Sequence, residues 1–202
     1  MAEIDGIGKG ALGGFAPSRE KAAAKLPAAE RFEMEAMPHF ADLFRTARRV
    51  LGDSAKAEDV TQEAYLQAWK SFGRFEPGTN CRAWMYKILF HCVQHHRRQS
   101  AHVRPLKESE EFLEANLVYN EPVPEQITDE DILAALDHVP EDYRDVLLLV
   151  DVQEFAYKET AEILEVPIGT VMSRLSRARK ALRDQLAEVA RSYGLRANPQ
   201  AI

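Results

Sequence analysis

The sequence predicts an all-α protein made of two small helical domains joined by an acidic, flexible linker. Residues 31–99 and residues 129–194 carry apolar residues at helical spacing, and neither stretch contains a strand-like alternation of useful length. Between them, residues 100–128 are acidic and broken by three prolines, a composition typical of linkers. Residues 1–30 are rich in alanine and glycine and predict a disordered extension, and residues 195–202 predict a short tail.

Composition limits the class of protein further. The chain has 202 residues, 46% of them hydrophobic, which is enough to bury two small cores. Its longest apolar run, Val146–Val150, is too short to cross a membrane, and the N-terminus lacks the basic and apolar regions of a signal peptide. The two cysteines argue against a disulfide scaffold. We therefore expect a cytoplasmic protein that does not insert into a membrane.

Charge is distributed unevenly along the chain, whose net charge is −6. Residues 101–130 carry two cations and eight acids, whereas residues 31–100 carry eleven cations and eight acids. Neutralisation of phosphates supplies most non-specific DNA affinity, so a chain with this balance should bind DNA weakly by itself. Any DNA binding is therefore expected to occur within a larger assembly.

The C-terminal stretch carries the pattern of a helix-turn-helix. A short helix over residues 157–164 is followed by a three-residue break and a longer helix from Ile168. The longer helix has one apolar stripe, formed by Val171, Leu175, Ala178 and Leu182. Beside this stripe lie the candidate DNA contacts Thr170, Ser173, Arg174, Arg177, Arg179 and Lys180. Hydroxyls and guanidinium groups suit base edges in a major groove, and cations suit phosphates. The alternative is an ordinary helix pair with a solvated basic side.

Two further helices in the N-terminal stretch carry candidate sites. Residues 57–69 form an amphipathic helix with an apolar side of Val60, Ala64 and Ala68 and a polar side of Asp59, Gln62 and Glu63. Residues 80–98 interleave aromatic with basic residues, which suits single-stranded DNA because unstacked bases can lie on rings. The candidates for this contact are Asn80, Arg82, Trp84, Lys87, His91 and His95.

Simpler interpretations of the same two helices remain open. The acids of the first helix could merely suit the positive end of its dipole, and some apolar residues of the second helix, Trp84, Ile88 and Phe90 among them, could face the core. His91 and His95 are four residues apart, a spacing found in metal sites, but no third ligand is evident beside them. We therefore predict neither a metal nor any other cofactor.

Together these motifs resemble the extracytoplasmic-function group of bacterial sigma-70-type sigma factors, over residues 38–190. The resemblance is carried by residues 57–63 with Trp69, by residues 75–84 and by residues 168–175, in that order along the chain. It implies the minimal two-domain kind, with sigma region 2 in residues 31–99 and sigma region 4 in residues 129–194.

The resemblance also implies a function. A protein of this group is not an enzyme but a sigma factor that binds core RNA polymerase and directs promoter-specific initiation, here in a stress or envelope response. Asp59, Gln62 and Glu63 would dock on the clamp coiled coil of the largest polymerase subunit. The helix after Asn80 would hold a flipped base and the single strand of the melted −10 element, and the helix from Ile168 would read the −35 duplex.

Control is expected to come from a partner. The resemblance implies an anti-sigma factor that clamps the two domains together and covers the Asp59–Glu63 surface. A stand-alone helix-turn-helix regulator is the main alternative function. It would explain the C-terminal half but leave both helices of the N-terminal half without a role.

Overall fold

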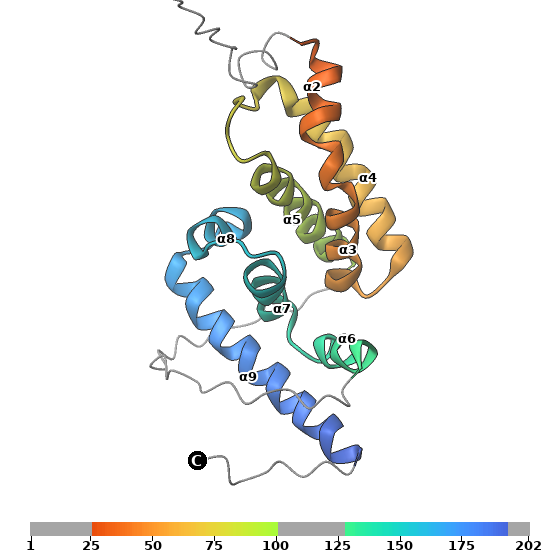
Figure 1. Ribbon diagram of the computed structural model, residues 1–202, viewed down its shortest axis with the longest axis vertical. Helices are drawn as coiled ribbons and strands as arrows, with labels where there is room; N and C mark the ends of the chain where they lie inside the picture. Colours follow the sequence, from red (N-terminus) through yellow and green to blue (C-terminus); the bar gives the residue numbers. More distant parts are fainter. Residues whose placement is uncertain (1–25, 101–127, 194–202) are drawn as a thin grey trace, which may run out of the picture.

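The computed structural model describes residues 26–100 and 128–193, and within these residues every regular element is helical (Figure 1). The fold class predicted from the sequence is therefore confirmed. The predicted tail and nearly all of the linker lie outside the described residues. The predicted disorder of residues 1–30 is wrong for Ala28–Glu30, because the first described helix already begins at Ala28.

The N-terminal unit consists of helices that pack around α5. Its elements are α2 (Ala28–Glu35), η1 (Met37–His39), α3 (Phe40–Leu51), α4 (Ser54–Ser71), η2 (Phe72–Arg74) and α5 (Cys81–Ser100). Between α3 and α4, Gly52 takes a left-handed conformation with φ 66° and ends α3. The next residue, Asp53, caps α4 by accepting hydrogen bonds from the backbone N–H groups of Ala55 and Lys56 at 2.9 and 3.2 Å.

The C-terminal unit contains the helix-turn-helix. Its elements are α6 (Asp129–Asp137), α7 (Glu141–Leu147), η3 (Leu148–Val152), α8 (Tyr157–Leu164) and α9 (Ile168–Ser192). The predicted break between α8 and α9 is confirmed, with Glu165 in a left-handed conformation at φ 56°. Pro167 lies immediately before α9, at the N-cap position. None of the described helices is both long enough and apolar enough to cross a membrane.

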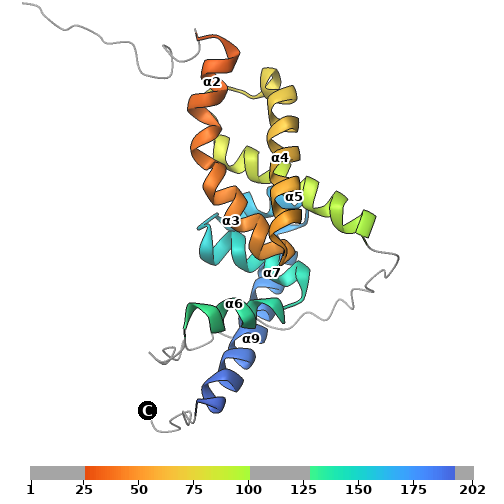
Figure 2. The same cartoon turned by 90° about the vertical axis from the view of Figure 1, so that its right-hand side faces the viewer.

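The two units pack directly against each other. Helix α5 lies against α8, and α3 lies against α6 and α7 (Figures 1 and 2). One continuous cluster of buried hydrophobic residues runs through both units, from Leu43 and Leu89 on one side to Phe155 and Leu164 on the other. The units are therefore joined by a shared core as well as by the connecting chain, a feature that the sequence did not predict.

Candidate nucleic-acid interface

The outward side of α4 is open to solvent. Asp59, Gln62 and Glu63 are all exposed, as the sequence predicted. The opposite side of the helix is buried, with Val60 1% exposed and Ala64 and Ala68 fully covered. Among the residues that the structure describes, the polar groups of the outward side bond along the helix: Gln62 donates to Glu58 at 3.3 Å, and Glu63 accepts from Gln67 at 3.0 Å. A protein partner could therefore reach this side without displacing a hydrogen bond to another described helix.

Apolar side chains border the same side of α4, and the sequence reasoning missed one of them. Leu66 is 53% exposed and Trp69 is 46% exposed, although both are large and hydrophobic. The Trp69 ring packs edge-on against Phe32 with 5.2 Å between centroids. Leu66 lies three and four residues after Glu63 and Gln62, and this spacing could have identified it. A polar patch with an apolar border is typical of a protein-binding surface.

The inner side of α5 belongs to the core. Tyr86 and Phe90 are fully buried, and the Tyr86 hydroxyl lies 3.1 Å from the Thr46 hydroxyl. Trp84 is half-buried and packs on Phe75 with 5.0 Å between ring centroids. The alternative that aromatic residues of this helix face the core is therefore confirmed for Phe90 and holds in part for Trp84.

Part of the outer side of α5 contacts the C-terminal unit. The Asn80 side-chain amide donates to a Glu159 carboxylate oxygen at 2.8 Å. One terminal nitrogen of Arg82 donates both to the backbone carbonyl and to the side-chain oxygen of Gln153, at 2.8 and 2.7 Å. The Lys87 ammonium lies 3.2 Å from a carboxylate oxygen of Glu165. These three predicted DNA contacts are thus brought together, but each already has a partner on the other unit.

Arg82 is also held by aromatic rings. Its guanidinium lies 4.2 Å from the centroid of the Phe155 ring and 5.3 Å from that of Tyr86. The two rings pack edge-on with 5.0 Å between centroids. Cation–π contacts of this kind strengthen when solvent is excluded, as it is around Phe155, which is 3% exposed.

His91 and His95 lie further along α5 and are exposed. His91 borders a cleft of about 230 Å³ between α5 and α8, together with Trp84, Lys87 and Ile163. Among the residues that the structure describes, no group of three or more histidine, cysteine, aspartate or glutamate side chains lies close enough to hold a metal ion. The arrangement offers stacking and cationic groups, but in this conformation α8 forms the opposite wall of the cleft.

Helix α9 has its apolar stripe inward, as predicted: Val171 and Ala178 are fully buried and Leu175 is 2% exposed. The predicted DNA contacts on α9 fall into two groups. Ser173, Arg179 and Lys180 are exposed, whereas Thr170, Arg174 and Arg177 are partly buried.

The arginines of α9 bond to acids and a tyrosine of their own unit. Arg174 donates to Asp142 at 3.1 Å, and Arg177 donates to the Tyr143 hydroxyl at 3.4 Å. Arg179 makes a two-point contact with Asp151, at 2.6 and 3.0 Å. To reach DNA, these side chains must exchange partners.

Two exposed residues of α9 escaped the sequence reasoning. Met172, which is 50% exposed, and Ser176 lie on the outward side next to Ser173. They are four residues apart, so they stack on one side of the helix, and this spacing was the available signal.

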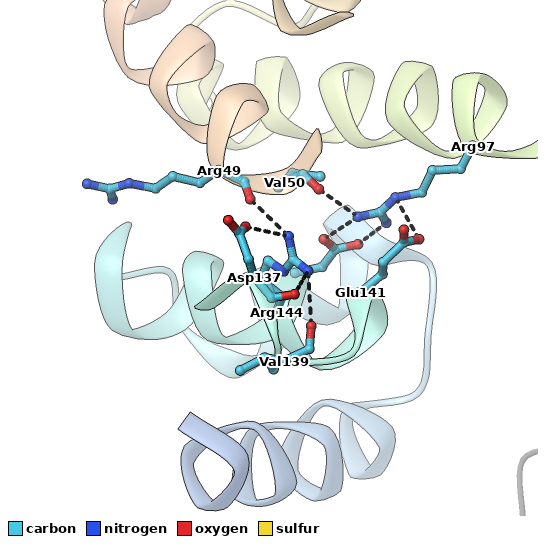
Figure 3. A network of polar contacts seen from close by, with 8 residues as sticks. Arg49, Val50, Arg97, Asp137, Val139, Glu141 and Arg144 are labelled. Carbon is cyan, nitrogen blue, oxygen red and sulfur yellow. Dashed lines mark hydrogen bonds and ion pairs between the residues drawn. The ribbon is translucent and has the colours of Figure 1, made fainter. Parts of the chain in front are cut away.

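A buried network of charged groups ties the two units together (Figure 3). Arg97 of α5 donates to both carboxylate oxygens of Asp145 in α7, at 2.6 and 3.0 Å. It also donates to the Val50 carbonyl at 3.4 Å and lies 3.2 Å from Glu141. Asp145 is only 4% exposed. Burial raises the pKa of its carboxyl above the usual value, whereas the hydrogen bonds from Arg97 act in the opposite direction.

A second arginine completes this network. Arg144 is 8% exposed and donates to the backbone carbonyls of Asp137 and Val139 at 3.0 and 3.1 Å. It also reaches the Arg49 carbonyl at the end of α3, at 3.4 Å (Figure 3). Two largely buried guanidinium groups, Arg97 from one unit and Arg144 from the other, thus bond to a carboxylate or a backbone carbonyl of the opposite unit.

Comparison with known proteins gives matches to both units. The family model "Sigma-70 region 2" matches residues 37–103, and "Sigma-70, region 4" matches residues 129–182. The ECF RNA polymerase sigma factor SigE of Mycolicibacterium smegmatis is 32% identical over 155 residues, which are 74% of this chain and 59% of that protein. The ECF RNA polymerase sigma factor SigM of Mycobacterium tuberculosis is 30% identical over 181 residues, which are 84% of this chain and 87% of that protein.

One solved structure is similar in both fold and sequence. It is that of the sigma factor RpoE from Bartonella quintana in complex with the anti-sigma factor NepR. The TM-score is 0.59 at 26% identity, and the similarity covers 78% of this chain and 97% of that one.

Proposed function

The chain belongs to the extracytoplasmic-function group of RNA polymerase sigma factors, and we propose that it binds core RNA polymerase and directs promoter-specific initiation. The observation that carries this proposal is the presence of both sigma regions in one chain, in the order that the group requires. The open polar side of α4 supports it, because it provides a surface for a large protein partner. The proposal assigns no catalysis to this chain and places its action in the cytoplasm, where polymerase is.

Three surfaces receive roles under this proposal. Asp59, Gln62 and Glu63 on α4 dock on the clamp coiled coil of the largest polymerase subunit. The outer side of α5, from Asn80 to His95, holds the melted −10 strand by stacking and by contacts with phosphates. The N-terminal half of α9 enters the major groove at the −35 element, with Ser173 and Arg177 as the base-reading candidates.

An anti-sigma factor is the regulatory partner that we propose. The similar protein from Bartonella quintana is in complex with one, and the exposed Leu66 and Trp69 beside the acids of α4 offer apolar surface that such a partner could bury. A pull-down from native cells under inducing and non-inducing conditions would test this. Recovery of polymerase alone under both conditions would contradict it.

Reconstitution with purified core polymerase tests the main proposal. Fragmented genomic DNA is transcribed with core enzyme alone, with added chain, and with an Asp59→Lys/Glu63→Lys variant, and the RNA ends are sequenced. We expect defined start sites that appear only with the wild-type chain and share upstream −10 and −35 sequences. Failure of the wild-type chain to bind core enzyme would overturn the proposal.

A stand-alone helix-turn-helix regulator is the second candidate, favoured only by the exposed outward side of α9. The same material separates the two functions. A regulator would bind specific duplex DNA tightly without polymerase, whereas a sigma factor with this charge balance should need core enzyme to do so.

A further inference from the structure

We propose that the free chain is autoinhibited, because its C-terminal unit docks on the outer side of α5 and engages Asn80, Arg82 and Lys87, three of the groups that would hold single-stranded DNA. The inference rests on the DNA role proposed for α5 and concerns the regulation of that site. It uses contacts within this chain alone and requires no anti-sigma partner.

The first argument is that docking and DNA binding require the same atoms. The Arg82 guanidinium already donates to Gln153 and lies on the Phe155 ring. The Lys87 ammonium faces a carboxylate of Glu165, and the Asn80 amide faces a carboxylate of Glu159. A nucleic-acid strand offers the same classes of partner, namely anionic oxygens, carbonyl oxygens and flat rings. The strand and the C-terminal unit therefore compete for one surface.

The second argument concerns how the C-terminal unit is shaped for this contact. After α7 the chain makes a wide π-helical turn, in which the Gln153 N–H donates to the Leu148 carbonyl at 2.9 Å. Glu154 follows with φ 57°, which is uncommon for a residue other than glycine. Such turns and conformations concentrate at functional sites. Here they place the Gln153 carbonyl and the Phe155 ring against Arg82.

The third argument is that the contact between the two units has a buried part and a solvent-exposed part. Arg97 and Asp145 form a buried, two-point charge pair, which holds the units in one register. The Lys87–Glu165 and Asn80–Glu159 pairs are more open: the Lys87 and Glu165 side chains are 51% and 67% exposed, and the Asn80–Glu159 hydrogen bond is exposed. Exposed pairs contribute little each, so docking at this edge can be reversed by a competing ligand. A ligand that binds only the separated units would shift the population toward them.

Glu165→Lys in the full chain tests the inference. It replaces the ion pair with repulsion against Lys87 and leaves every proposed DNA-binding residue in place. The matched control is Glu162→Lys, which makes the same charge change on α8 at an exposed carboxylate with no ion pair within the described residues. Glu165→Asn is a second variant that removes the charge while suiting the left-handed backbone at this position.

Two properties are measured for each protein: the radius of gyration by small-angle X-ray scattering, and affinity for a fluorescent pool of random 20-nucleotide single strands by anisotropy. We expect a larger radius and about fivefold tighter binding for Glu165→Lys than for Glu162→Lys, with Glu165→Asn in between. If Glu165→Lys and Glu162→Lys have the same radius and the same affinity, the inference is overturned.

A third outcome separates this inference from the function on which it rests. A larger radius without any gain in binding would show that the units separate but that α5 does not bind single-stranded DNA. The inference of autoinhibition would then be overturned. Binding of core polymerase is measured in parallel and should be retained by all the proteins, because the outward side of α4 is untouched. If none of the proteins, wild type included, binds core polymerase, the proposed function is contradicted. The scattering measurement still tests whether the two units dock.

Discussion

Helices α4 and α5 are neighbours in one unit, but solvent reaches their outward sides to different extents. On α4 the polar groups of this side bond, among the described residues, to the same helix, and Asp59 and Glu63 are exposed. On α5 the side chains of Asn80 and Arg82 bond to residues 71 to 79 positions away, in the other unit. The surface proposed for polymerase is thus available, whereas the surface proposed for DNA is partly occupied.

This difference indicates an order of events. A partner that uses α4 can bind first, whereas a strand that uses α5 must wait until the C-terminal unit leaves. The net charge of −6 should already make premature DNA binding weak, and docking would reduce it further.

The largest effect should come from Asp145→Ala, which leaves the Arg97 guanidinium buried without its carboxylate. Breaking a buried pair in this way costs about 3–5 kcal/mol. The units can escape this cost by separating, so we expect a larger radius of gyration together with a lower free energy of unfolding in urea.

Asp142→Ala is the control for that variant, on the same helix. Its carboxylate is half exposed and pairs with Arg174 within the C-terminal unit, so the loss should stay below about 1 kcal/mol. Equal losses for the two variants would show that the Arg97 pair does not hold the units together.

Helix α9 is intermediate between α4 and α5, because Arg174, Arg177 and Arg179 bond to residues outside the helix but within the same unit. Arg177→Ala should cost about 1–3 kcal/mol at the cognate −35 element and less at a base-substituted one. Lys180→Ala should weaken all sequences alike and reduce the salt dependence by roughly one ion. Open-complex assays across a salt series measure both. If Arg177→Ala loses the same binding free energy on every promoter, Arg177 contacts phosphate and does not read a base.

On α4 we expect a change of function with almost no change of stability. Asp59→Lys or Glu63→Lys should alter the free energy of unfolding by less than about 0.5 kcal/mol, because both side chains are exposed. Either variant should weaken binding to core polymerase in a pull-down titration, whereas Glu188→Lys, at an exposed position on α9, should not. If the α4 variants unfold, Asp59 and Glu63 stabilise the fold, and the proposed role of α4 in polymerase binding is contradicted.

The smallest effect concerns the inner side of α5, which should not respond to docking at all. Burial raises the pKa of the Cys92 thiol to about 12 and that of Cys81 to about 11. The thiolate is the reactive form, so both thiols should react slowly with a disulfide reagent at pH 8 and faster as the pH rises toward these values. Glu165→Lys should leave the Cys92 rate unchanged. A faster rate would mean that separation of the units loosens the core of α5.

Local features of the fold were predictable from the sequence. The inward stripe of α9 and the buried side of α4 follow from apolar spacing, and the break at Gly52 and Asp53 follows from their capping chemistry. Docking of the two units was not predictable, because it joins polar residues far apart in sequence and no periodicity marks such pairs. Asp145 illustrates this: in the sequence it merely ends an apolar run, whereas in the structure it receives Arg97.

The candidate sites also have features that the sequence could predict and features that it could not. Exposure of Asp59, Gln62 and Glu63 followed from the amphipathic pattern of α4. The same reasoning could identify Arg82 and Lys87 as cations on the outside of α5, but not their partners on the other unit.

Hydroxyl-radical footprinting of the chain, alone and bound to core polymerase, tests the contrast between α4 and α5 most directly. In the free chain Trp69 should be oxidised readily and Phe155 hardly at all, since they are 46% and 3% exposed. In the complex the pattern should reverse, with side chains of α4 protected and Phe155 oxidised as α5 is uncovered. A Phe155 that is oxidised readily in the free chain, or that stays protected in the complex, would contradict the account.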